Sequence, residues 1–146
     1  MRGDWFSQSS IVELFVSKGM EEIQDGAFSQ CRNLVKVTFA EDCKLPKISK
    51  NCFQETGIAK IDIPDSVVSI EDNAFYACKN LKRVIFQESS KLERIGNCCF
   101  CNCDLNDFYA PSSLKEIADY AFQNCSNLRL VSLHKNLKML GKLETP

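Results

Sequence analysis

The sequence predicts a solenoid of about six stacked coils, because a single repeat recurs along nearly the whole chain of 146 residues. One column of phenylalanines has alternating spacings of 25 and 22 residues and consists of Phe28, Phe53, Phe75, Phe100 and Phe122. An isoleucine precedes each phenylalanine by five residues, at Ile23, Ile48, Ile70, Ile95 and Ile117. A repeat of this size cannot bury its apolar side alone, but stacked neighbours bury it together.

Each repeat also contains a short segment with apolar residues at alternate positions, which indicates a β-strand. The alternating pairs are Leu14/Val16, Val37/Phe39, Ile61/Ile63, Val84/Phe86, Phe108/Ala110 and Val131/Leu133. Parallel strands from successive coils are expected to form a sheet along one concave face. Pro64 and Pro111 follow two of these strands, where proline cannot extend a strand ladder and favours a turn.

The convex face is expected to carry short helical or 3₁₀ turns. In segments such as AFYAC, two adjacent apolar residues are followed by a cysteine three positions later, which fits one turn better than a long helix. The predicted organisation is a disordered or truncated end over residues 1–10, one repeat domain over 11–140 and an uncapped end over 141–146.

The pattern Ile-x-x-x-Ala-Phe-x-x-Cys-x-x-Leu-x-x-Val-x-Phe, alternating with Ile-Pro-x-Ser-Val-x-x-Ile, resembles the BspA-like leucine-rich repeat family. The resemblance is clearest in IDIPDSVVSIEDNAFYACKNLKRVIF, residues 61–86. It implies a leucine-rich repeat solenoid. From the properties of the family it also implies a cell-surface or secreted protein of mucosal bacteria or anaerobic protists such as trichomonads, with host or extracellular-matrix proteins as partners.

The predicted binding face consists of the strand positions that point away from the core, toward the concave surface. Its candidate residues are Phe15, Lys36, Thr38, Lys60, Asp62, Arg83, Ile85, Asp107, Tyr109, Ser132 and His134. Aromatic or aliphatic side chains beside basic ones are typical of protein interfaces. The alternative is that these positions vary freely while the core is kept.

Most of the nine cysteines follow the repeat. Cys31, Cys78, Cys103 and Cys125 share one column, and Cys52 and Cys99 replace the alanine found in the other repeats. Free cysteine behaves as a small buried apolar residue, so reduced thiols are expected rather than a disulfide scaffold. The CCFCNC segment at 98–103 contains Cys-x-x-Cys, but no second pair or histidine lies at zinc-finger spacing, so no metal site is predicted.

The sequence does not predict an enzyme, a cofactor or a nucleic-acid partner. No acid or nucleophile is tied to the single histidine, His134, by a motif, and no glycine-rich phosphate loop is present. The net charge of -1 leaves no basic excess for nucleic acid. There is no apolar run long enough to span a bilayer, and no secretory signal is recognised, so the sequence does not define the location of the protein.

Two short motifs are given little weight. Arg2-Gly3-Asp4 matches the integrin-binding tripeptide, which arises often by chance. Asn124-Cys125-Ser126 is a glycosylation sequon, but Cys125 belongs to a predicted core column.

The preferred function is a non-enzymatic protein-binding or adhesive module. An intracellular protein-interaction scaffold, favoured by the missing secretory signal, and a structural spacer without a ligand of its own are the alternatives. Either self-association or completion by flanking sequence is expected as well, because an uncapped end exposes apolar core and a free sheet edge.

Overall fold

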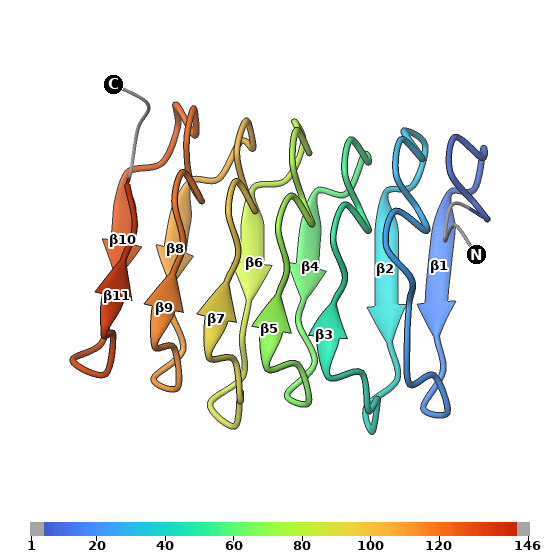
Figure 1. Cartoon of the computed structure of the whole chain (residues 1–146). Coiled ribbons are helices and arrows are strands. Elements are labelled where there is room, and N and C mark those ends of the chain that lie inside the picture. Colours follow the sequence, from blue (N-terminus) through green and yellow to red (C-terminus); the bar gives the residue numbers. More distant parts are fainter. Residues whose placement is uncertain (1–4, 143–146) are drawn as a thin grey trace.

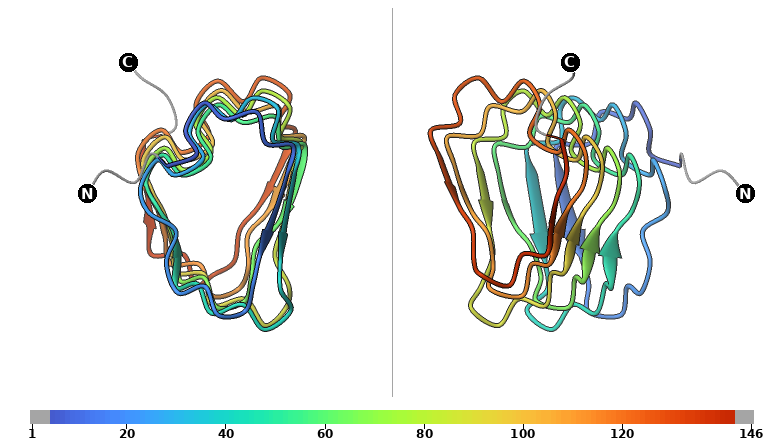
Figure 2. Two further views of the ribbon diagram at one scale, coloured as in Figure 1. Left: turned by 90° about the vertical axis from the view of Figure 1, so that its right-hand side faces the viewer. Right: turned by 60° about the vertical axis from the view of Figure 1, so that its left-hand side comes forward.

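The chain forms a parallel β-solenoid in the computed structural model, which describes residues 5–142 (Figure 1). Viewed along its axis, each coil has two side walls that carry strands and two ends that carry turns (Figure 2). The predicted stack of about six coils is therefore confirmed, and the strands pair only with equivalent strands of neighbouring coils.

The six predicted strands all form, and they line one side wall. These long strands are β1 (Glu13–Val16), β2 (Lys36–Phe39), β4 (Lys60–Asp62), β6 (Arg83–Ile85), β8 (Asp107–Tyr109) and β10 (Leu130–Ser132). Their hydrogen-bonded ladders join β1 to β2, β4 to β6 and β8 to β10, all parallel. The expected single sheet along this wall is therefore divided into three two-stranded sheets.

The other side wall is a second parallel sheet that sequence analysis did not predict. Its short strands are β3 (Lys47–Ile48), β5 (Ser69–Ile70), β7 (Arg94–Ile95), β9 (Glu116–Ile117) and β11 (Met139–Leu140). All five pair in one continuous sheet, in which Ile48, Ile70, Ile95 and Ile117 are in register. Most of the predicted isoleucine column is therefore the buried position of this sheet.

The prediction of helical or 3₁₀ turns on the convex face is wrong, because no helix or 3₁₀ turn is found among residues 5–142. The phenylalanine segments are instead overlapping β-turns. In the third coil, the N–H of Ala74 bonds to the carbonyl of Glu71 at 3.2 Å, whereas the N–H of Phe75 bonds to Cys99 of the next coil at 3.0 Å. Asn73 and Ala77 have φ of 56° and 55°, in the left-handed region, which interrupts any helical path.

The core is organised around the phenylalanine column. Phe53, Phe75 and Phe100 are fully buried, and consecutive rings of the column stack with centroids 5.5 to 5.7 Å apart. The column also extends one coil further than the sequence pattern indicated, because Phe6 stacks on Phe28 at 5.4 Å. Phe6 lies within the range of residues predicted to be a disordered or truncated end.

The cysteine column packs beside the phenylalanines and also forms hydrogen bonds. The thiols of Cys31, Cys78 and Cys125 donate to the phenylalanine carbonyl of the preceding coil at 2.8, 3.0 and 3.1 Å. Thr56 takes the same column position and donates to the carbonyl of Phe53 at 3.0 Å. The column therefore requires a small side chain that carries a donor, which both Cys and Thr supply.

Candidate functional site

The candidate site is the outer surface of β1, β2, β4, β6, β8 and β10, named here the long-strand face. Along each strand one residue enters the core while its neighbours face outward; for example, Phe108 is buried between the exposed Asp107 and Tyr109. The outward side chains thus form two columns across the coils. The strand pairing places Lys36 beside Glu13 in the first column.

The structure places all the predicted binding residues on or next to this face. Nine are exposed, namely Phe15, Lys36, Thr38, Lys60, Asp62, Arg83, Asp107, Tyr109 and His134. Ile85 and Ser132 are partly buried. Two aromatic rings are held in solvent, with Phe15 67% and Tyr109 59% exposed. Leu130, also exposed and paired with Asp107, extends the face beyond the predicted set.

The clearest depression on the long-strand face lies between β6 and β8. It has a volume of about 370 Å³, and its lining includes Arg83, Ile85, Asp107 and Tyr109. Phe86 supports it from below, because its ring meets the ring of Phe108 edge-on at 5.9 Å. A partner side chain can therefore contact apolar, aromatic and charged groups at one place.

The basic side chains of this face are largely free of carboxylate partners. Within residues 5–142, neither Lys36 nor Arg83 has a carboxylate within 4 Å, and Lys60 contacts Asp62 only at 3.8 Å. Such an exposed pair contributes little to stability. These charges are therefore available to a partner.

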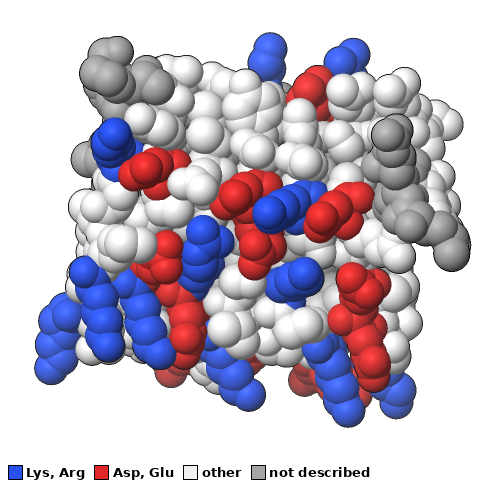
Figure 3. Space-filling view, viewed as in Figure 1, with Lys and Arg blue, Asp and Glu red and all other residues white. Residues whose placement is uncertain are grey.

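On the short-strand wall some charges are paired with each other, although the exposed Lys47 and Lys138 have no carboxylate within 4 Å among residues 5–142. Arg94 lies 3.3 Å from Glu116, 3.8 Å from Asp72 and 3.9 Å from Glu71. Lys115 pairs with Glu93 at 2.7 Å. The space-filling view in Figure 3 also shows acidic and basic side chains side by side across the middle of that view, with Lys and Arg grouped along its lower left edge.

Most of the cysteine thiols are buried; at Cys78 burial acts to raise the pKa, but hydrogen bonds with Cys103 and Thr56 lower it overall. Burial is the main cause that raises the pKa of Cys52 and Cys99, and it raises the pKa of Cys125 to about 11. These thiols are therefore protonated at neutral pH and poor nucleophiles. Within the CCFCNC segment the side chains of Cys98 and Cys101 contact each other, whereas the Cys103 thiol donates to the Phe75 carbonyl at 3.1 Å.

The single histidine lies next to this face, and the short sequence motifs lie elsewhere or outside the described residues. His134 is exposed, just after β10. No group of three metal-ligating side chains occurs in the described part of the chain. Arg2-Gly3-Asp4 lies outside the described residues. Asn124 of the sequon is exposed and donates to the side chain of Asn102 at 3.0 Å.

The sequence model of the BspA type leucine rich repeat region matches residues 2–129 in six copies. The chain belongs to the BspA-type leucine-rich repeat family. No sequence among the curated proteins matches it. Over the stretch that is described, this BspA-type chain contains no helix that is long and apolar enough to cross a membrane.

Several solved structures share the fold of this BspA-type chain. The pneumococcal vaccine antigen PcpA is 24% identical with a TM-score of 0.74, over 88% of this chain and 30% of its own. The leucine-rich repeat protein of T. pallidum is 24% identical with a TM-score of 0.70, over 89% and 73%. A leucine-rich cell surface protein of Faecalibacterium prausnitzii is 22% identical with a TM-score of 0.57, over 90% and 44%. The chain thus spans less than a third of the length of the pneumococcal antigen.

Proposed function

We propose that this BspA-type module is non-enzymatic and binds a protein partner through the long-strand face. The observation that carries the proposal is the contrast between the two side walls. The long-strand face combines two exposed aromatic rings with Lys36 and Arg83, which have no carboxylate within 4 Å among the described residues. On the other wall Arg94 and Lys115 are held by neighbouring carboxylates, and exposed aromatic rings are not among its strand residues. Aromatic residues and arginine are the groups that most often dominate binding energy at protein interfaces.

The proposed location is the cell surface, with host or extracellular-matrix proteins as the partners. Two of the structural neighbours support this setting, one being a vaccine antigen and the other a cell surface protein. The alternatives are an intracellular interaction scaffold and a spacer without its own ligand. A spacer would not require the two exposed aromatic rings, Phe15 and Tyr109, on one strand wall.

Joint replacement of Arg83, Ile85 and Tyr109 by alanine tests the face. These residues line the depression between β6 and β8, and losing its central contacts should weaken partner binding at least about tenfold, as expected when interface hot spots are removed. Binding is measured by surface plasmon resonance on immobilised fibronectin, laminin and collagen. Circular dichroism checks that the unfolding midpoint changes little, since Arg83 and Tyr109 are exposed.

The matched control is a triple alanine variant of Lys47, Val68 and Lys138, which are exposed residues in or beside the short strands. It should bind as tightly as the unmodified chain. Unchanged binding by the Arg83, Ile85 and Tyr109 variant would show that the long-strand face is not the contact surface. If the unmodified chain binds none of the matrix proteins, the adhesive role is contradicted.

We also propose that the chain self-associates head to tail through its end coils. Phe6, Met20 and Trp5 line an apolar depression of about 340 Å³ at one end. Phe122 and Leu140 line another of about 530 Å³ at the opposite end. Because the coils stack in one direction with similar cross-sections (Figure 2), one end of a molecule can meet the other end of the next, and such contacts do not close on themselves.

The 146-residue chain should therefore show a mass above that of the monomer, increasing with concentration, in size exclusion with light scattering. Replacing Val131 and Leu140 by aspartate should shift it to the monomer, because both line the depression at one end. The control is Val68→Asp, which alters an exposed apolar residue on a side wall. This variant should not shift the chain to the monomer. A monodisperse monomer at every concentration loaded would contradict the proposal.

A further inference from the structure

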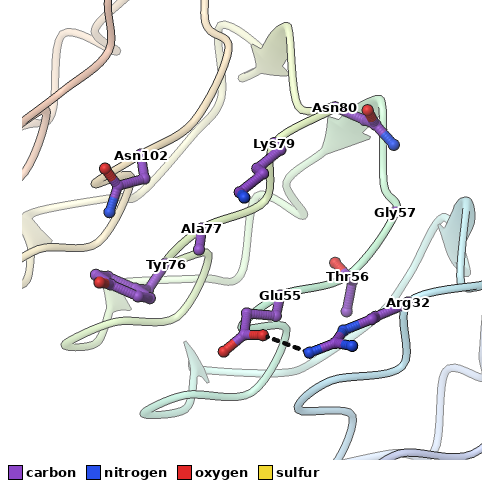
Figure 4. A pocket seen from close by; sticks show the side chains of 9 residues that line it. All are labelled: Arg32, Glu55, Thr56, Gly57, Tyr76, Ala77, Lys79, Asn80 and Asn102. Atoms are coloured by element: carbon purple, nitrogen blue, oxygen red, sulfur yellow. Dashed lines mark hydrogen bonds and ion pairs between the residues drawn. The ribbon is translucent and has the colours of Figure 1, made fainter.

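Alternate coils differ in length at the corner that leads from the phenylalanine column into the long strands. Val37 follows Phe28 by nine residues, whereas Ile61 follows Phe53 by eight. The shorter turn passes from Thr56 through Gly57 to the buried Ile58, two residues before β4 begins, and it lies between the longer turns of the coils on either side. A notch of about 760 Å³ lies over this shorter turn (Figure 4).

Backbone packing keeps the floor of this Gly57 notch free of side chains. A Cβ atom at Gly57 would lie 2.6 Å from the carbonyl oxygen of Arg32 and 3.3 Å from that of Leu34, both of which are backbone atoms. No larger residue fits there without moving the preceding coil. Ala77 of the next coil adds only a methyl group to the lining.

The rim of the notch carries an excess of positive charge. Arg32 and Glu55 pair at 3.1 Å, and Figure 4 shows the two side chains pointing at each other. A guanidinium has five N–H groups and Arg32 is 73% exposed, so this pair leaves donors available. Lys79 also lines the notch, and no carboxylate lies within 4 Å of its amine in the described part of the chain.

The equivalent place one double repeat along the chain is already occupied by a carboxylate. Asp104 stands where Gly57 stands, because Cys103-Asp104-Leu105 corresponds to Thr56-Gly57-Ile58. Its carboxylate accepts a hydrogen bond from the side chain of Asn127 on the following coil and lies 3.9 Å from the amine of Lys82 on the preceding one. Asn80, which lines the Gly57 notch, is the counterpart of Asn127.

We propose that the Gly57 notch binds the carboxylate of an acidic side chain in a protein partner. At the other notch the carboxylate belongs to the chain itself, at Asp104. At the Gly57 notch the partner provides the carboxylate. Arg32, Lys79 and Asn80 are the donors that receive it, and charge-assisted hydrogen bonds of this type are the stronger ones. The inference rests on the proposed protein-binding function in one respect, namely that the carboxylate belongs to a protein partner.

The direct test is a titration of the ¹⁵N-labelled chain with a Glu-Glu dipeptide that is acetylated and amidated at its ends. Amide signals of Gly57, Ala77 and Lys79 should shift, and those around Asp104 should not. The Gln-Gln dipeptide with the same end groups should produce no saturable shift. Raising the salt concentration to about 0.5 M should weaken binding, because the charges on the rim are exposed to screening.

Substitutions separate the notch from general surface charge. Lys79→Gln should weaken binding about threefold to tenfold, as expected for one charge-assisted contact, and Lys79→Arg should retain it. Lys91→Gln removes another exposed lysine and is the matched control. Asp104→Ala empties the second notch and should add a new set of shifts around Leu105 and Asn127.

Equal shifts with the Gln-Gln dipeptide, or equal weakening by the Lys79 and Lys91 variants, would overturn the proposal. Tighter binding of inorganic sulfate than of the Glu-Glu dipeptide would overturn it too, in favour of a sulfated sugar as the ligand. The Arg83, Ile85 and Tyr109 variant leaves the notch intact and should still bind the dipeptide. A result that contradicts binding through the long-strand face can therefore be distinguished from one that contradicts binding at the notch.

Discussion

Replacing Phe75 by alanine is expected to lower the free energy of unfolding by about 3–5 kcal/mol, the usual cost of removing a buried aromatic ring. Phe75 is fully buried, and its ring stacks on Phe53 at 5.6 Å and on Phe100 at 5.5 Å. Each coil of a solenoid contacts only its neighbours, so a cavity at this position weakens two coil interfaces at once. Urea denaturation followed by circular dichroism measures the change.

Two other phenylalanines provide the comparison for Phe75. Phe6 is 47% exposed and, among residues 5–142, its ring stacks on Phe28 alone, so Phe6→Ala should lower the free energy of unfolding markedly less. Phe15 lies outside the column and is 67% exposed, and Phe15→Ala should change stability by about 0.5 kcal/mol or less. If Phe75→Ala lowered the free energy of unfolding no more than Phe6→Ala does, the stacked column would not be the main source of stability.

Gly96→Ala is expected to destabilise the chain by about 1–3 kcal/mol, the range found when groups are forced into a packed site. A Cβ at Gly96 would lie 2.6 Å from both the backbone nitrogen and the carboxylate Oδ1 of Asp72. That Oδ1 accepts the N–H of Asn97 at 2.8 Å, so the intruding methyl also displaces a bond between coils. The loss should appear as a lower midpoint in thermal and urea denaturation.

Gly19→Ala is the control for Gly96→Ala, because no atom lies within 4 Å of the added Cβ. Its stability should stay the same or rise slightly, since alanine restricts the unfolded chain more than glycine does. If the two variants behaved alike, close packing around Gly96 would not explain its presence.

The core and the long strands were predictable because their signals repeat. The phenylalanine and isoleucine columns recur through five successive repeats, and the long strands alternate apolar and polar residues. The short strands were missed because each contains only two residues, as in β5 (Ser69–Ile70), which is too short to show an alternation. Their stability comes from the equivalent residues of neighbouring coils, which a pattern within one repeat does not reveal.

The turns at the phenylalanine column were predicted incorrectly for a related reason. A helical turn and these overlapping β-turns both place an apolar pair and a cysteine on the same side. The two structures differ in their backbone hydrogen bonds. In the β-turns, alternate N–H groups bond to carbonyls of the next coil, as the N–H of Phe75 does to the carbonyl of Cys99. Asn73 and Asn102 take up left-handed φ values of 56° and 60°, for which asparagine is better suited than most residues.

The residues of the long-strand face could be located from strand alternation alone, and the structure adds which of them share a depression. The Gly57 notch could not be located in this way. It arises from a difference of one residue between alternate turns, and from the close approach of the Gly57 and Arg32 backbones. Only the stacking of coils in three dimensions places Lys79 and Arg32 around the same space.

The ladders between long strands have a consequence for how such a chain can lengthen. Leu14 and Val37, 23 residues apart, lie in paired strands, whereas Val37 and Ile61, 24 residues apart, belong to strands that share no ladder. Inserting one coil would place two units of equal length side by side and disturb this alternation. Gene duplication is therefore expected to add or remove coils two at a time, in steps of 47 residues, the distance from Phe28 to Phe75.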